Sequence, residues 1–68
     1  MKKSIEVIDL SRHPELQRLA VDNEPYVAIL RDPWGQELSA TGGSTADEAL
    51  NKLKEQQSLD EDIRIINR

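Results

Sequence analysis

The segment PYVAILRDPWGQELSAT, residues 25–41, contains the pattern that decides the fold. Residues 25–31 alternate with apolar side chains on both faces, which predicts a central strand. The following DPWG, residues 32–35, has the residue types that a type I turn favours at each position. Gly35 is free to take a positive φ and form a β-bulge. Residues 36–41 then predict a second strand, so we expect an antiparallel hairpin.

Trp34 lies at the tip of this hairpin, in a chain with one tyrosine and no phenylalanine. Two interpretations are open. The indole folds back onto the hairpin or the start of a helix and closes a small core, where a buried aromatic ring contributes about 2 kcal/mol or more. Alternatively, it contacts another subunit or a partner, because tryptophan is enriched among residues that dominate binding energy. We predict partial exposure and a role in an interface.

Upstream, the sequence predicts a strand and then a short helix. Residues 4–10, SIEVIDL, are β-branched with apolar positions on both faces, so we expect a strand covered on both sides for part of its length. Residues 11–23 change period and predict a helix of two to three turns. Pro14 suits its first turn, and Ser11 or His13 is the expected cap.

Downstream, Gly42 and Gly43 are interpreted as a flexible break, and residues 44–57 predict an amphipathic helix. Thr45 at its N-cap and Glu48 three positions later form the pattern of a capping box.

Residues 58–62 are expected to form a polar loop and residues 63–66, IRII, a last strand that pairs within the sheet or with another chain. The expected architecture is a single α+β domain over residues 1–68. Its order is β-α-β-β-α-β, with two helices on one face of a small, mainly antiparallel sheet.

The composition limits the classes of protein to which the chain belongs. A chain of 68 residues buries only about 60% of the surface that its unfolded form exposes. Without cysteine there is no disulfide to compensate, so we expect a homodimer or larger homo-oligomer. The net charge of −4 disfavours nucleic acid as the direct ligand and suits a basic protein partner. The absence of a long apolar run or a signal peptide leads us to expect no membrane contact and a cytoplasmic location.

No catalytic or metal-binding constellation is found in the sequence. His13 is the only histidine and has no acid or nucleophile beside it in the sequence. Ser11, Ser44 and Thr45 precede predicted helices, where hydroxyl groups cap backbone N–H groups. The carboxylates of residues 60–62 lack the glycine and the spacing of a calcium loop. We therefore expect a non-enzymatic protein with no cofactor and no metal.

The hairpin and the second helix together carry a family pattern. Tyr26-Val27-Ala28 opens a strand, Asp32 and Gly35 bracket the turn, and Gly43-Ser44-Thr45-Ala46-Asp47-Glu48-Ala49-Leu50 begins the helix. Over residues 26–54 the chain resembles the HicB family of antitoxin-like proteins. The resemblance implies a partial ribonuclease-H-like fold without catalytic carboxylates. It also implies direct inhibition of a small basic mRNA-cleaving toxin.

A second resemblance covers residues 5–40 and accounts better for the helix inserted before the hairpin. The strand Ile5-Glu6-Val7, the bend Asn23-Glu24-Pro25 and the segment from Gly35 to Ala40 are similar to the prevent-host-death antitoxins. That similarity implies a dimer that binds DNA. A third possibility is an orphan or phage-type inhibitor with an unrelated protein target.

The partner-binding residues that we predict lie on the hairpin and on the strands at the margins of the sheet, because unpaired strand edges invite strand addition. They are Trp34, Tyr26, Asp32, Ile63 and Ile65.

Overall fold

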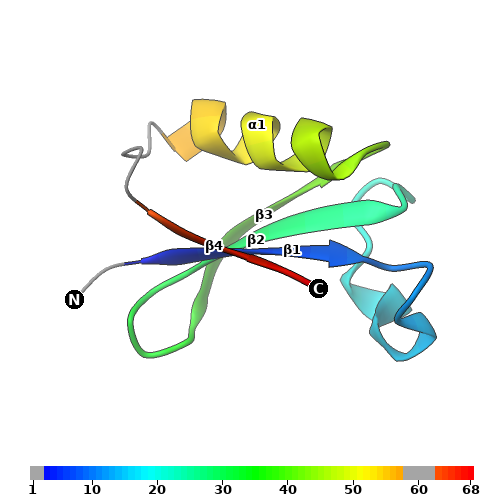
Figure 1. Ribbon diagram of the computed structural model, residues 1–68, viewed down its shortest axis with the longest axis horizontal. Helices are drawn as coiled ribbons and strands as arrows, with labels where there is room; N and C mark the ends of the chain where they lie inside the picture. The colour runs from blue at the N-terminus through cyan, green and yellow to red at the C-terminus, as the bar shows by residue number, and fades with distance from the viewer. Residues whose placement is uncertain (1–2, 58–62) are drawn as a thin grey trace.

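The computed structural model describes residues 3–57 and 63–68. It shows a small α+β domain with a mixed sheet of strand order β3-β2-β1-β4, in which β1 is antiparallel to β2, β2 to β3, and β4 is parallel to β1 (Figure 1). The elements are β1 (Ser4–Asp9), a 3₁₀ helix η1 (Pro14–Leu19), β2 (Tyr26–Arg31), β3 (Glu37–Gly43), α1 (Ala46–Gln57) and β4 (Arg64–Asn67). The predicted loop over residues 58–62, with its carboxylates, lies outside the described residues.

Strand β1 is buried on both faces, as its sequence predicts. Ile5 and Val7 belong to the hydrophobic cluster beneath α1. Ile8 and Leu10 belong to a second cluster on the opposite face of the sheet, which we call the underside. The backbone of the sheet separates the two clusters, because successive side chains on a strand point to opposite faces.

The underside is covered by η1 and the loop after it, not by α1. The prediction of two helices on one face is therefore wrong: α1 packs against β3, β2 and β1, whereas η1 packs against the underside cluster on the opposite side (Figure 1). Strand β1 sets this division, because Ile8 and Leu10 point away from α1 and need a cover of their own. Leu16, Leu19 and Ala20 supply it.

The predicted first helix is also a different kind of helix. It is a 3₁₀ helix of six residues, and neither Ser11 nor His13 caps it through a side chain. Asp22 and Asn23 follow with φ values of 55° and 58°, in the left-handed region that ends helices. The connection from β1 to β2 has few residues with which to cover the underside cluster. It does so with one short 3₁₀ helix and a bend.

The start of α1 follows the predicted cap in part. The Glu48 backbone N–H donates to Thr45 Oγ1 at 3.0 Å, which satisfies one of the free N–H groups of the first turn. The Glu48 carboxylate contacts the Ser44 hydroxyl and Lys52 Nζ, not the Thr45 backbone. The helix therefore has the Thr45 cap, without the reciprocal half of a capping box.

Gly42 and Gly43 are not a flexible break. They are the last residues of β3, and both are buried. A Cβ on Gly42 would lie 2.3 Å from the Val21 carbonyl oxygen, and a Cβ on Gly43 would lie 2.5 Å from the Ala49 backbone nitrogen. The pair thus lets the loop before β2 and the helix α1 approach the sheet from opposite faces.

We expect Gly42→Ala to lower the free energy of unfolding by about 2 kcal/mol or more, because the added methyl group meets backbone that cannot turn aside. Urea denaturation measures this loss. Ser39→Ala on the same strand is the control and should change stability much less. Equal stability of the Gly42 variant and the wild type would show that Val21 does not pack against β3.

The pKa of the Glu48 carboxyl is lowered by the hydrogen bond from Ser44 and then by Lys52. A carboxyl whose pKa is lower in the folded state stabilises the fold above its unfolded pKa, and this contribution is lost as the pH falls through the folded value. We therefore expect wild-type stability to fall more steeply than that of Glu48→Gln as the pH drops below about 4.5, the ordinary pKa. Thermal unfolding across this pH range measures the difference, and parallel curves would contradict it.

Candidate protein-binding surface

The turn between β2 and β3 is held by one carboxylate. Asp32 Oδ1 accepts hydrogen bonds from the backbone N–H groups of Trp34 and Gln36, each at 2.9 Å. The Gly35 N–H donates to the Asp32 carbonyl at 3.0 Å, and Gly35 has a φ of 88°. Arg31 Nη1 donates to the Gly35 carbonyl at 3.1 Å. The hairpin tip is therefore a fixed platform, as expected from its turn residues.

Trp34 projects from this platform with 75% of its surface exposed. The interpretation in which the indole folds back and closes a core is therefore wrong for the isolated chain. The indole is more exposed than the partial exposure that we predict, and its role in an interface stays a prediction. Leu38, on the next strand of the same hairpin, is 48% exposed. Trp34 and Leu38 are thus two large apolar side chains exposed on the same hairpin, which makes the hairpin a candidate interaction site.

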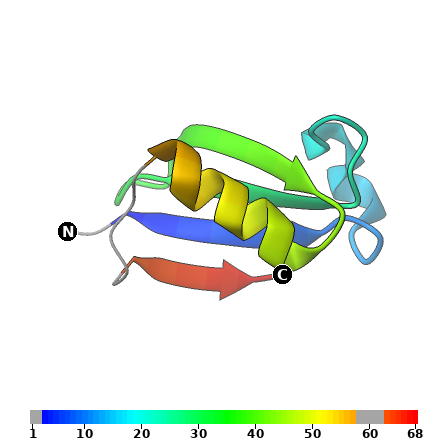
Figure 2. The ribbon, with the colours of Figure 1, turned by 90° about the horizontal axis from the view of Figure 1, so that it is seen from above.

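Strand β3 adds a free backbone edge to these side chains. It is the end strand of the sheet, with β2 on one side only (Figure 2). Its end at Thr41, Gly42 and Gly43 is buried, whereas Glu37 and Leu38 are exposed and the next two residues are half-buried. We call Asp32, Trp34, Leu38 and the backbone edge of residues 37–40 the hairpin surface.

A bulge shapes this surface and explains why sequence reasoning missed Leu38. The register of β2 with β3 shifts opposite Leu30 and Arg31, so Arg31 pairs with Glu37 while Leu30 pairs with Ser39. The alternation of β3 places Leu38 with Ala40, and Ala40 does pack against the underside cluster. The extra residue at the bulge instead leaves Leu38 at the open end of the strand. Gly35 belongs to a separate bulge at the turn, where its N–H donates to the Asp32 carbonyl and the Asp32 N–H donates to the Gln36 carbonyl. No residue type in β3 signals the second bulge at Leu38.

The other predicted residues do not gather at this surface. Tyr26 pairs with Gly43 at the opposite end of β2 and packs half-buried against the cluster beneath α1. Ile63 also packs against that cluster. Ile65, 36% exposed, lies on β4 at the other edge of the sheet. Of the five, Trp34 and Asp32 lie together at the hairpin tip, whereas Tyr26 and Ile63 share the cluster beneath α1.

The polar groups considered for chemistry have local structural partners. His13 Nδ1 lies 3.3 Å from the Glu15 carboxylate, both near the surface. Ser11 donates to the Asp9 carboxylate, and this hydrogen bond is the first cause of the lowered pKa of Asp9. Within residues 3–57 and 63–68, no group of three or more His, Cys, Asp or Glu side chains is placed to hold a metal ion. None of the described helices is long and apolar enough to cross a membrane.

Comparisons of the chain with protein-family models, with curated proteins and with solved structures gave no match.

The exposed position of Trp34 predicts that it contributes little to the stability of the isolated chain. Trp34→Ala should change the free energy of unfolding by less than about 0.5 kcal/mol. Asp32→Ala should cost about 1 kcal/mol or more, because it removes two hydrogen bonds from the turn. Urea denaturation followed by far-ultraviolet circular dichroism compares the two variants. Unfolding of Trp34→Ala, together with blue-shifted indole emission in a proven monomer, would place the indole in a core.

Proposed function

We propose that this chain is a HicB-like, non-enzymatic antitoxin or inhibitor module, and that it binds and blocks a small basic mRNA-cleaving toxin. The observation that carries the proposal is the hairpin surface, which joins a large exposed aromatic side chain to an open strand edge. Such an edge recognises a partner strand through backbone hydrogen bonds, while neighbouring side chains provide selectivity. Trp34 has the size and exposure of a binding hot spot.

The charge of the chain supports a basic partner. The net charge is −4, and the hairpin that carries Trp34 also contains the acidic residues Asp32 and Glu37. Complementary potentials accelerate the encounter of two proteins and orient their approach. The Asp32 carboxylate already accepts two backbone hydrogen bonds. It therefore contributes to partner binding through its negative charge and by holding the turn in place.

The proposal also includes a more specific description of the fold. We propose that the sheet is a partial ribonuclease-H-like fold. Three successive antiparallel strands, a helix, and a last strand parallel to the first support this assignment. A cytoplasmic location and a homodimer or larger assembly follow from the same function, since an mRNA-cleaving toxin acts where mRNA is translated and a chain of this size gains stability from association.

One observation favours a second candidate, a dimeric DNA-binding antitoxin of the prevent-host-death type. The segment between β1 and β2 contains a short helix followed by a bend in which Asn23 has a positive φ, directly before Glu24 and Pro25. This order of strand, helix, bend and strand is the one on which that resemblance rests. A salt-dependent shift of its own promoter DNA by the purified protein would favour this candidate over the toxin-binding one.

The test of the proposed function is binding to a small basic mRNA-cleaving toxin, measured by calorimetry together with inhibition of mRNA cleavage. We expect a complex at micromolar concentration or below, and we expect Trp34→Ala and Leu38→Lys each to weaken it by about tenfold or more. Asn51→Lys, on the exposed side of α1, adds the same charge as Leu38→Lys and should leave the affinity nearly unchanged. Absence of a complex, or equal losses in the control, would refute the proposal.

A further inference from the structure

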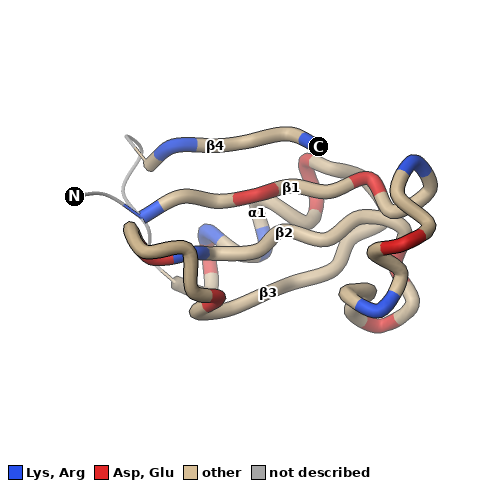
Figure 3. Tube along the Cα trace, turned by 90° about the horizontal axis from the view of Figure 1, so that it is seen from below, with Lys and Arg blue, Asp and Glu red and all other residues tan. Residues whose placement is uncertain are grey.

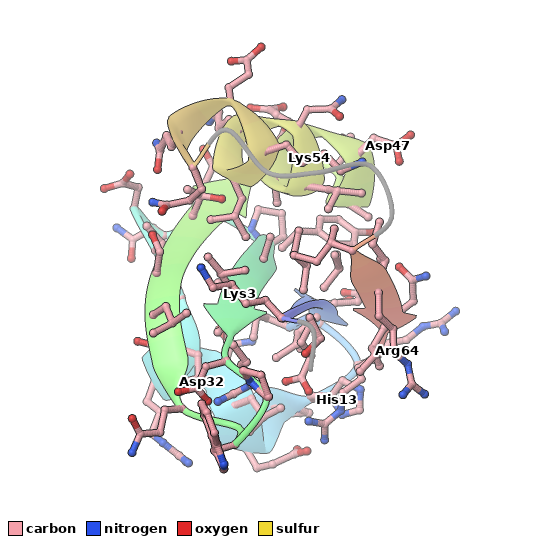
Figure 4. The ribbon with its side chains drawn as sticks, turned by 90° about the vertical axis from the view of Figure 1, so that its left-hand side faces the viewer. Lys3, His13, Asp32, Asp47, Lys54 and Arg64 are labelled. Atoms are coloured by element: carbon pink, nitrogen blue, oxygen red, sulfur yellow. The ribbon has the colours of Figure 1, made fainter. Side chains whose placement is uncertain are left out.

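The second edge of the sheet, β4, has a chemistry opposite to that of the hairpin surface. Alternation along β4, with Arg68 directly after it, places Arg64, Ile66 and Arg68 on the underside, since Arg64 pairs with Ser4 and Ile66 pairs with Glu6. Figure 4 shows Arg64 pointing away from α1, and Figure 3 shows basic residues at both ends of this edge.

The three basic groups outnumber the two acidic groups near them. One of the acidic groups is Glu15, since a backbone hydrogen bond and, to a smaller extent, the charge of Arg68 lower the pKa of its carboxyl. Glu6 is mostly buried, and its Oε1 lies 3.3 Å from Arg68 Nη1 and 3.7 Å from Arg31 Nη2. One carboxylate is thus shared by two guanidinium groups, and Arg64 adds a third positive charge on the same face. A chain of net charge −4 therefore has a locally positive strip along the underside of β4.

The backbone of β4 also has hydrogen-bonding groups directed outward. The Arg68 N–H donates to the Val7 carbonyl at 2.7 Å, and the Arg68 carbonyl accepts from the Asp9 N–H at 3.3 Å. In a parallel ladder alternate residues bond to the same neighbour, so Ile65 and Asn67 direct their N–H and C=O groups to the other side. Among the described residues no strand lies on that side of β4.

On the face toward α1, the same edge has room for apolar side chains. Ile65 pairs with Ile5 and is 36% exposed, because α1 covers the neighbouring strands more than β4. Beyond it lies a shallow pocket of about 220 Å³ at the end of the strand, lined by Val7, Asp9, Arg12, Tyr26, Ala46, Asn67 and Arg68.

We propose that β4 is a second docking site, which takes an extended acidic segment of another protein as a fifth strand of the sheet. Carboxylates at alternate positions of that segment meet Arg64 and Arg68 on the underside. Its apolar side chains, on the other face, cover Ile65 and reach the pocket beside Tyr26. Backbone hydrogen bonds from Ile65 and Asn67 supply affinity, and the two faces supply selectivity.

A second copy of this chain does not fit the same edge through its own β4. In a twofold antiparallel pairing, residues directly opposite share a face of the sheet. Depending on the register, Arg64 of one copy then lies either directly opposite Arg68 of the other copy or diagonal to Arg64 and Arg68 of that copy. Like charges at these positions destabilise strand pairing, whereas an acidic strand neutralises them. The charge pattern therefore selects an acidic partner over self-association.

The test uses the full chain and an acetylated, amidated peptide of alternating glutamate and valine, followed by amide chemical shifts and hydrogen exchange. We expect shifts centred on Ile65 and Asn67, slower exchange of their amides, and binding that weakens with salt. Peptides of alternating lysine and valine, or with N-methyl groups on alternate amides, should bind at least about tenfold more weakly.

Two variants locate the site. Arg64→Glu should weaken binding by about tenfold or more, whereas Arg18→Glu, the same charge change on η1, should have little effect. Ile65→Pro removes an outward N–H without breaking a bond to β1, so it should fold and lose binding. Equal binding of the N-methylated peptide, or of a single-stranded oligonucleotide of the same charge, would show attraction by charge alone and overturn strand addition. Because Trp34→Ala should leave this binding intact, failure here is distinguishable from failure of the proposed toxin interaction.

Discussion

The burial of β1 and β2 on both faces is the constraint on which the rest of the structure depends. Val27 and Ile29 face the underside with Ile8, while Ala28 and Leu30 face α1. Each face needs its own cover, because exposed aliphatic side chains lose about 25 cal/mol per Å² of stabilisation. With α1 committed to one face, the short segment before β2 must cover the other, and this requirement produces η1.

The same constraint leaves two strand edges open, β3 and β4, and different features limit pairing at each of them. The far end of β3 is closed by the contact of Gly42 with the loop at Val21, and its near end is bent by the bulge. Only residues 37–40 remain available for pairing. At the other edge β4 is only four residues long, begins with Arg64 and is followed directly by Arg68. Short length, bulges and charge are the usual means by which sheet edges avoid unwanted pairing.

The hairpin and the second helix were predictable because their signals are local. The turn residues from Asp32 to Gly35 and the Thr45 cap determine their own hydrogen bonds, and the structure contains them. The sequence did not predict that the first helix is a 3₁₀ helix, since the spacing of Leu16 and Leu19 fits a 3₁₀ helix as well as an α-helix. Its side of the sheet followed from Ile8 and Leu10, which the sequence already placed on the face opposite Ile5 and Val7. The parallel pairing of β4 and the exposure of Leu38 depend on tertiary register, which no local pattern encodes.

The difference in charge between the two edges has a consequence for assembly. Acidic groups accompany β3 at Asp32 and Glu37, whereas Arg64 and Arg68 accompany β4. Pairing of β3 from one copy with β4 of the next would satisfy both edges electrostatically, but such a head-to-tail contact builds a ring or an open filament and not a twofold dimer. The bulge and the buried end of β3 shorten the stretch available for that contact to residues 37–40. Each edge can therefore be recognised by a partner of suitable charge, while the pairing of unlike edges between copies of this chain is restricted by the backbone itself.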